Sequence, residues 1–415
     1  MEQVSTARAS ALDLMHCSSR STIAIGPISG LDPQVVLDRY TRLARVGPAA
    51  RIGLWATSDN RWKCSTEVAD RVVVLPASDD PQALLTSFRE PGITRTRVGV
   101  AGQYLLIDYN HGVGDIALLS RFIEVILAGV DPQNPDLWRR TALPPLLTAT
   151  ARTYANPLRL LRMAAWYRRN RDLAPPLTAP GRDTAQVRPQ SAAVIPSTAI
   201  ARIPAASVQR LRAWRDEHQP GVSVVTLIVF ALRAAFEKAG IEPTDRVTLP
   251  FDARVYLPKN THTLGNFAAG LDFDCGPEVT PQSLQAAITE AFTIGRPVAN
   301  LVVSSLKVRA GRRAGRTRPM PSSADAADQR VSLLYSSLNT VPRTAAIPWD
   351  DTAPAQFLVA SDPAAATSVT VTSAMADGDM TFTATFYDTV YEPQSVVSAL
   401  NLATGDTIAL LRNHS

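Results

Sequence analysis

The sequence has little of the chemistry that builds disulfide frameworks, zinc clusters or membrane spans. Its 415 residues include three cysteines, Cys17, Cys64 and Cys275, and five histidines. The cysteines are isolated and odd in number, which argues against a disulfide framework and fits a reducing cytoplasm. No histidine has a cysteine or glutamate at metal-ligand spacing, so we expect no metal. No apolar run approaches the roughly 18 residues that cross a bilayer. The N-terminus lacks the pattern of a secretory signal, so we expect a cytoplasmic protein.

Charge is also sparse. Charged residues make up 19% of the chain and hydrophobic residues 46%, with a formal net charge of +5. This composition is typical of a soluble globular protein, and the length suggests two domains of about 150–220 residues each. Arginines gather in 152–171 and 309–318. A positive balance is compatible with an acidic partner or with ordinary surface solubility. Because no aromatic residues interleave with the arginines of 309–318, we expect no nucleic-acid partner.

The first part of the chain alternates between strand and helix patterns. We expect strands at 22–29, 51–55, 71–75 and 103–109, and helices at 33–43, 81–88 and 116–127. Apolar residues recur at helical spacing in the last of these helices. The alternation predicts a layered α/β sheet.

The second part repeats this logic after a Pro/Ala/Thr-rich stretch. We expect strands at 197–203, 246–251, 271–274 and 331–338, a hairpin of 368–374 with 380–387, and helices at 207–217, 223–239, 281–295 and 393–402. The composition of 173–196 is that of a linker. We therefore predict an α/β (α+β layered) fold with an N-terminal lobe at 1–175, a linker at 176–196 and a C-terminal lobe at 197–415, each with a mixed sheet packed on helices.

The segment His111-Gly112-Val113-Gly114-Asp115 lies between a buried strand and an apolar helix. It resembles a catalytic histidine held in a tight turn, whose near-neutral pKa suits proton transfer. It also fits plain connection chemistry, with Asp115 as helix N-cap and Gly112 and Gly114 as turn residues. The chain has no G-x-S-x-G elbow to supply a hydrolase nucleophile, so the base would act on the nucleophile of a substrate.

Three ordered motifs resemble those of the condensation-domain and CoA-dependent acyltransferase superfamily. Residues 110–115 are similar to its H-H-x-x-x-D-G signature, 252–258 to its D-x-R-x-x-L-P segment, and 264–267 to its L-G-N-F run. The superfamily includes chloramphenicol acetyltransferase, plant acyltransferases, peptide condensation domains, wax ester synthases and mycobacterial polyketide-associated acyltransferases. The resemblance covers essentially the whole chain. Asn110 replaces the first histidine, Ile116 the glycine, and Ala269 an asparagine of condensation domains, which points away from mainstream peptide synthesis.

The resemblance implies a chloramphenicol-acetyltransferase-like pair of lobes with an active-site tunnel between them. It makes His111 and Asp115 the catalytic pair. His111 would deprotonate an acceptor hydroxyl or amine that attacks an acyl thioester, while Asp115 pairs with Arg254 and fixes the turn. Coenzyme A or a phosphopantetheine arm would carry the thioester as co-substrate, with no tightly bound cofactor. Asp252 is expected to be structural.

Further residues are candidates for the tunnel or for substrate binding. These are Gly114, Asn266, Ser337 and Asn339, of which the last three equally fit hydrogen bonding at turns and strand edges. The amphipathic basic helix at 152–171 has two interpretations. It docks an acidic acyl-carrier protein or an anionic membrane surface, or it packs its Leu/Trp/Tyr face and leaves its arginines in solvent. We expect 309–318 to form a mobile loop that could contact the phosphates of coenzyme A.

The sequence thus predicts a freestanding acyltransferase of secondary-metabolite or lipid biosynthesis. Its acyl donor would be acyl-CoA or an acyl-carrier protein, and its acceptor a small molecule or lipid with a hydroxyl or amine. A second interpretation is a non-catalytic, condensation-like protein that binds carrier proteins in an assembly line. The acyl chain, the acceptor, the choice of ester or amide, and the oligomeric state stay open, because tunnel shape sets selectivity.

Overall fold

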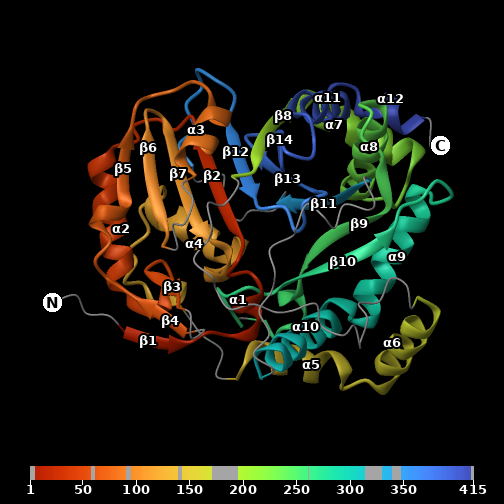
Figure 1. The fold of residues 1–415 in the computed structure, drawn as a ribbon, viewed down its shortest axis with the longest axis horizontal. Helices are drawn as coiled ribbons and strands as arrows, with labels where there is room; N and C mark the ends of the chain where they lie inside the picture. The colour runs from red at the N-terminus through yellow and green to blue at the C-terminus, as the bar shows by residue number, and fades with distance from the viewer. Residues whose placement is uncertain are drawn as a thin grey trace.

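The fold is that of a computed structural model, which describes residues 5–57, 61–89, 95–138, 143–170, 195–259, 261–313, 330–338 and 347–412. Two large sheets lie side by side in Figure 1, one built mainly from the first half of the chain and one from the second. Helices cover their outer faces. This is the two-lobed arrangement of mixed sheets and helices that the pattern predicts.

The first half contains the following elements: β1 (Ser5–Arg8), α1 (Ala11–Met15), β2 (Arg20–Gly26), α2 (Pro33–Arg45), β3 (Leu54–Ala56), β4 (Arg61–Cys64), β5 (Val72–Leu75), α3 (Pro81–Phe88), β6 (Arg97–Ala101), β7 (Tyr104–Asn110), the 3₁₀ turn η3 (His111–Val113), α4 (Ile116–Ile126), α5 (Pro145–Tyr154) and α6 (Pro157–Arg169).

The second half contains these elements: β8 (Ser197–Ile203), α7 (Ala205–His218), α8 (Val224–Lys238), β9 (Pro243–Asp252), the 3₁₀ turn η5 (Ala253–Tyr256), β10 (Ala268–Asp274), α9 (Pro281–Ile294), α10 (Arg296–Arg313), β11 (Val331–Leu338), β12 (Gln356–Ser361), β13 (Ser368–Ala376), β14 (Asp379–Phe386), α11 (Pro393–Gly405) and α12 (Thr407–Arg412).

The first large sheet takes a strand from the second half of the chain. Its order is β12-β2-β7-β6-β5, and β12 pairs antiparallel with β2 in a register that opposes Phe357 to Ile25. Figure 1 shows β12 beside β2, at the boundary between the two sheets. The predicted division at 176–196 stays a prediction, and strands from both sides of it build this sheet.

The second large sheet has the order β10-β9-β11-β13-β14-β8. The β13–β14 pair is the hairpin expected from the sequence, and β11 lies parallel to both β9 and β13. Parallel and antiparallel pairs coexist in this sheet, so it is mixed. A third, small sheet of β1, β4 and β3 lies near the N-terminus.

Each large sheet buries its own apolar core. In the first, Ile23, Ile107 and Phe122 are among the buried residues, and in the second Phe230, Phe273 and Phe382. Helix α2 shows how the sequence sets the packing. Asp32 accepts a hydrogen bond from the Gln34 backbone N–H at 2.8 Å as N-cap, and Val36, Tyr40 and Leu43 then recur on the buried face.

Several expected boundaries shift for local reasons. The strand expected at 51–55 begins only at Leu54, because Arg51 has a left-handed φ of 62° that interrupts extended pairing. The expected helix at 152–171 is two helices. Asn156 caps α6 by accepting from the Leu158 backbone N–H at 2.9 Å, and Pro157 occupies the first turn, so α5 stops before it.

The prediction of a loop at 309–318 is wrong for the residues of that range that the structure describes. Helix α10 runs on to Arg313, so Arg309 lies on a helix, and the remainder of that range is outside the described residues. Buried Val298, Leu301 and Ser305 recur three and four residues apart on this helix, a spacing typical of a helix that packs on one face. The linker expected at 176–196 likewise lies almost entirely outside the described residues. No helix within the described ranges has the length and apolar content that a membrane crossing requires.

Candidate functional site

The turn after β7 is held by the residue that departs from the resembled signature. The Asn110 side chain accepts from the Gly112 backbone N–H at 2.9 Å and donates through Nδ2 to the Cys17 carbonyl at 2.6 Å. The His111 backbone N–H donates to the Ser19 carbonyl at 2.9 Å. Asparagine is a favoured cap of such turns because its short amide reaches the backbone. The Asn110 side chain therefore stabilises the backbone conformation of the turn that carries His111.

The imidazole of His111 meets the second half of the chain at Asn266. His111 Nδ1 lies 3.1 Å from Asn266 Oδ1. Asn266 Nδ2 donates to the His111 carbonyl at 2.9 Å and to the Gly112 carbonyl at 3.3 Å. Only the Nδ2 atom of the amide carries hydrogens, so these two bonds leave Oδ1 as the acceptor that faces the ring. The proton between the two side chains then sits on His111 Nδ1, and in the neutral ring Nε2 is left with the free lone pair.

A second histidine, His16, which belongs to no motif, lies next to His111. The ring centroids of His16 and His111 are 5.0 Å apart, and that of Tyr109 is 6.2 Å from His111. His16 follows α1, in a stretch without a recognisable motif. No sequence signal marks it, because only the folding of α1 against the turn brings it there.

Asp115 is the brace that the resemblance implies. Its carboxylate accepts from Arg254 Nη2 at 2.8 and 3.0 Å, from the Phe267 backbone N–H at 2.9 Å and from the Ala117 backbone N–H at 3.1 Å. The Asp115 side chain is 7% exposed and that of Arg254 is 15% exposed. One carboxylate therefore caps α4 and joins it to two segments of the other half of the chain.

Arg254 is held from several sides. Its Nε donates to the Thr263 carbonyl at 2.9 Å, its Nη2 to the Gly265 carbonyl at 2.8 Å, and its Nη1 to Asp252 Oδ1 at 3.0 Å. Burial lowers the pKa of Arg254, but the carboxylates of Asp115 and Asp252 outweigh it and hold the pKa above the ordinary value. The guanidinium thus stays charged and pins the loop that carries the L-G-N-F run.

A second ion pair, Asp13 with Arg51, supports the same turn and was missed by the sequence analysis. Arg51 Nη2 lies 3.0 Å from Asp13 Oδ2, and Arg51 Nε donates to the Val113 carbonyl. Asp13 Oδ1 also accepts from the Asn266 backbone N–H at 3.2 Å. These two residues are far from the turn in sequence and belong to no motif, so nothing local identifies them.

Gly114 has a packing reason to be glycine. A Cβ on Gly114 would lie 2.6 Å from the Leu264 carbonyl oxygen and 2.8 Å from Leu118 Cδ2. Such distances are below van der Waals contact, so the two backbones meet here only because no side chain intervenes. The substrate-binding role suggested for Gly114 stays a prediction, while its structural role follows from this approach.

Of the other two tunnel candidates, Ser337 belongs to the part of the chain that the structure describes. Ser337 lies on β11 opposite Ser373 of β13. Among the residues that the structure describes, it shares no hydrogen bond with the His111 turn. Asn339 lies outside the described residues. The structure therefore brings His111, Gly114, Asp115, Arg254 and Asn266 into direct contact. The roles suggested for Ser337 and Asn339 stay predictions.

Burial controls the ionisation of the neighbouring weak acids. Burial, with a smaller contribution from the adjacent Asp13 carboxylate, raises the pKa of the Cys17 thiol to about 12. Burial also raises the pKa of Tyr109, again with a contribution from a carboxylate, that of Asp115. Both groups stay protonated at neutral pH, so neither competes with His111 as a base.

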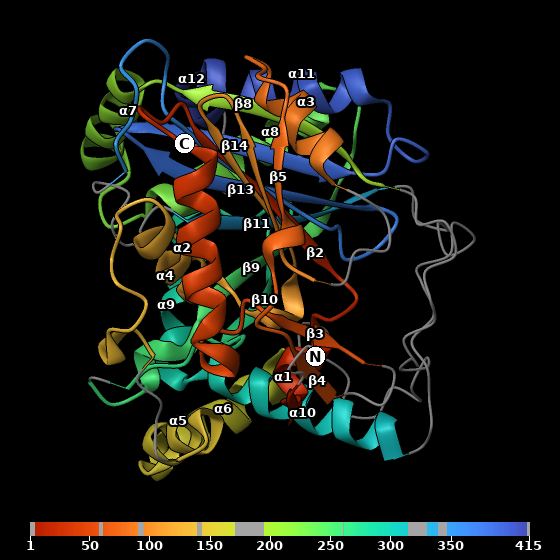
Figure 2. The same ribbon diagram turned by 90° about the vertical axis from the view of Figure 1, so that its left-hand side faces the viewer.

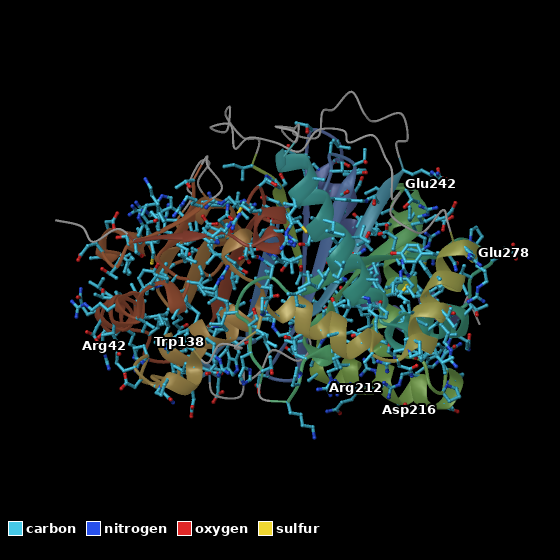
Figure 3. The ribbon with its side chains drawn as sticks, turned by 90° about the horizontal axis from the view of Figure 1, so that it is seen from below. Arg42, Trp138, Arg212, Asp216, Glu242 and Glu278 are labelled. Carbon is cyan, nitrogen blue, oxygen red and sulfur yellow. The ribbon has the colours of Figure 1, made fainter. Side chains whose placement is uncertain are left out.

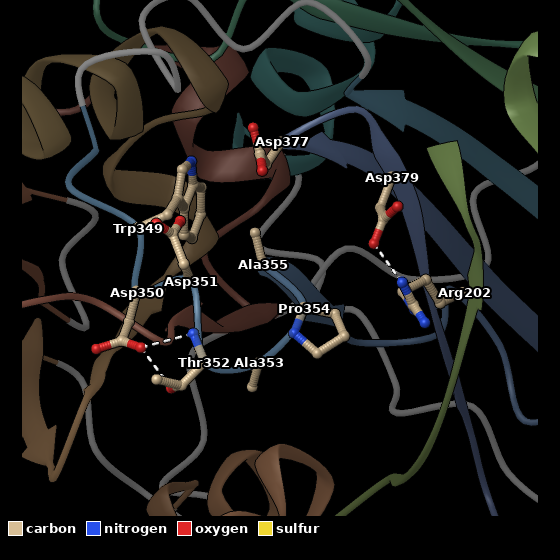
Figure 4. Close-up of a pocket in the computed structure, with 10 residues that line it drawn as sticks. All are labelled: Arg202, Trp349, Asp350, Asp351, Thr352, Ala353, Pro354, Ala355, Asp377 and Asp379. Atoms are coloured by element: carbon tan, nitrogen blue, oxygen red, sulfur yellow. Dashed lines mark hydrogen bonds and ion pairs between the residues drawn. The ribbon is translucent and has the colours of Figure 1, made fainter. Parts of the chain in front are cut away.

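Two cavities lie away from the His111 turn. Figure 4 shows one of about 380 Å³, lined by the segment 349–355 before β12 and by Asp377, Asp379 and Arg202 around the β13–β14 hairpin. Another of about 480 Å³ is lined by residues such as Thr244, Asp272 and Arg330. Neither is lined by the His111 turn, so the tunnel between the lobes stays a prediction. Within the described part of the chain, no three His, Cys, Asp or Glu side chains are grouped to hold a metal ion.

No family model and no curated protein matches this sequence. Solved structures do match it in fold. FmoA3, a nonribosomal peptide synthetase, covers 98% of this chain at 16% identity and a TM-score of 0.59, and this chain spans only 42% of that protein. The TRI3 trichothecene 15-O-acetyltransferase from Fusarium sporotrichioides covers 99% at 10% identity and a TM-score of 0.58, with 96% of that chain matched. The condensation domain of the monacolin K polyketide synthase MokA covers 98% at 14% identity and 0.56, with 96% of that chain matched.

The TM-scores and the coverage of this chain establish a shared fold, and identities this low establish no more than that. The chain has the chloramphenicol-acetyltransferase-like fold found in condensation domains and in an O-acetyltransferase. The resemblance inferred from three short motifs is thereby confirmed at the level of fold, as is the α/β fold class. Activity is a separate matter, because one fold serves several chemistries.

Proposed function

We propose that this chain is an acyltransferase that moves an acyl group from a thioester to a hydroxyl or amine, with His111 as general base. The observation that carries the proposal is the Asn266–His111 hydrogen bond of 3.1 Å at Nδ1. Together with the two bonds donated by Asn266 Nδ2, it leaves His111 Nε2 as the ring nitrogen able to take a proton. The fold shared with an O-acetyltransferase and a condensation domain supports the same chemistry.

The proposed step balances without a metal or redox cofactor. His111 Nε2 removes the proton of the acceptor O–H or N–H as its oxygen or nitrogen attacks the thioester carbonyl carbon. The tetrahedral intermediate then collapses and the C–S bond breaks. The departing sulfur takes from Nε2 the proton that came from the acceptor. The products are an ester or amide and a free thiol.

Asn266 acts in this scheme as a positioning residue, and Asp115 and Arg254 keep the two halves of the site in register. Asn266 touches both the ring and the backbone of His111, so a single side chain sets the tautomer and the orientation of the base. Asp115 contacts the backbone of Phe267, next to Asn266, so its ion pair with Arg254 holds Asn266 in place.

For the substrates, we propose a thioester of coenzyme A or of a phosphopantetheine arm as donor and a small-molecule or lipid acceptor, in secondary-metabolite or lipid biosynthesis in the cytoplasm. Acyl-CoA and acyl-carrier protein are offered separately to the protein with candidate acceptors, and the products are weighed by intact-mass analysis. Acyl transfer by the wild-type protein that disappears in His111→Ala supports the proposal. Carrier-protein binding with no transfer from either donor supports the non-catalytic alternative instead.

A further inference from the structure

Helices α5 and α6 form the lower edge of the molecule in Figures 1 and 2, and Figure 3 looks onto this underside. The inner faces of both helices pack against the rest of the protein. Met163 and Trp166 of α6 are buried with Ile294, and Tyr154 of α5 donates to the Gly295 carbonyl at 2.9 Å. The aromatic part of this segment therefore packs inward, as one of the two interpretations of 152–171 requires.

Four leucines of the same helices are exposed instead. Leu147, Leu158, Leu160 and Leu161 are each between 55% and 66% exposed. Leu158 and Leu161 are three residues apart and Ala165 follows four later, so they share one face of α6. Single exposed leucines are ordinary on protein surfaces, but four on two consecutive helices need an explanation. The packing interpretation alone leaves these exposed leucines unexplained.

The charge of this segment has one sign. Residues 143–170 contain no aspartate or glutamate and five arginines: 152, 159, 162, 168 and 169. Arg152, Arg162, Arg168 and Arg169 are all exposed. Of these, Arg169 forms an ion pair, with its Nη2 3.1 Å from Glu290 Oε1. Arginine can rest its stem on apolar surface and extend its guanidinium towards phosphate.

We propose that α5 and α6 dock the protein on an anionic lipid bilayer, with the leucines entering the headgroup layer and the arginines facing lipid phosphates. Outward leucines beside exposed arginines, without acidic residues, are the composition of helices that lie in a membrane interface. Docking sites for proteins are usually centred on aromatic anchors. Here Trp166 is 5% exposed and turned inward, which favours the bilayer over a carrier protein. The proposal is independent of the acyltransferase chemistry.

The test is vesicle co-sedimentation of the full-length protein, with phosphatidylcholine vesicles and with vesicles of phosphatidylcholine and phosphatidylglycerol in equal parts. We expect binding to the anionic vesicles that weakens with added salt. The double variant Arg162→Gln/Arg168→Gln should weaken it by roughly fivefold for each arginine lost. Leu158→Gln/Leu161→Gln should weaken it by roughly tenfold or more.

Matched controls lie at the other end of the molecule. Leu402→Gln on α11 changes a leucine that is 42% exposed, and Arg212→Gln on α7 removes an exposed arginine, labelled in Figure 3. Both should bind vesicles like the wild-type protein. His111→Ala should also bind normally, which separates docking from catalysis.

Three outcomes would overturn the proposal. The wild-type protein could fail to bind anionic vesicles, it could bind neutral and anionic vesicles equally, or the α6 variants could bind as the controls do. Capture of an acidic carrier protein by α6 in the absence of vesicle binding would assign the surface to a protein partner instead.

Discussion

Removing the Asp115 carboxylate should weaken the whole assembly of the site, and the contacts allow the effect to be sized. Asp115→Ala leaves Arg254 buried without its main partner, a change that costs about 3–5 kcal/mol in a buried pair. Loss of the α4 N-cap adds about 0.5–2 kcal/mol. Arg254 keeps Asp252 and the carbonyls of Thr263 and Gly265, so some of its charge stays compensated. We therefore expect the free energy of unfolding to fall by about 3 kcal/mol, at the lower end of these ranges.

The assay is urea and thermal unfolding followed by tryptophan fluorescence, with a double-mutant cycle through Arg254→Met. The double variant should lose less than the sum of the single variants, by about 0.5–3 kcal/mol. Asp131→Ala is the matched control, because its pair with Arg42 spans 3.0 Å but the two side chains are 60% and 46% exposed. Figure 3 labels Arg42. The control should cost less than about 1 kcal/mol. An unchanged midpoint in Asp115→Ala, or strictly additive effects, would refute the pairing argument.

Three further predictions concern the same turn. Gly114→Ala should lower the unfolding free energy by about 1–3 kcal/mol, because its Cβ would press on the Leu264 carbonyl; an unshifted melting temperature would count against this close approach. Cys17, with its pKa near 12 against an ordinary 9.0, should react with iodoacetamide at pH 8 roughly a thousandfold slower than a free thiol, and faster as the pH rises; labelling at the rate of a free thiol would show that the burial is absent. Asn266→Ala should lower kcat by roughly tenfold or more with little change in KM. ¹⁵N shifts of His111 should then show Nδ1 protonated in the wild-type protein and mixed tautomers in the variant, whereas an Nε2-protonated wild-type ring would overturn the role of Asn266.

Short motifs predicted the centre of this site because they record backbone constraints. Gly114 must be small where the Leu264 backbone approaches, and Asp115 and Arg254 must be charged to join two halves of the chain. Each of these requirements fixes a residue type within a short stretch of sequence, so the motif can be recognised even though Asn110 replaces the usual histidine. The hydrogen-bonding amide of Asn110 explains why this departure is compatible with the turn.

What the sequence did not reveal depends on distant packing. Asp13, His16 and Arg51 reach the turn only after α1 and the segment before β3 fold against it. The pairing of β12 with β2 was likewise hidden, since hydrophobic periodicity indicates a strand and says nothing of its neighbours. Helix α10 was missed because glycines and arginines near its end suggested a loop, although its buried residues recur at helical spacing.

The central claim is that His111 takes the proton of the acceptor during thioester cleavage. Its most direct test is the rate of thiol release with a matched donor and acceptor, compared between His111→Ala and His262→Ala, an exposed histidine outside the site. We predict that His111→Ala lowers this rate by about 10²–10⁴-fold and that His262→Ala leaves it unchanged. Full turnover by His111→Ala would contradict the claim.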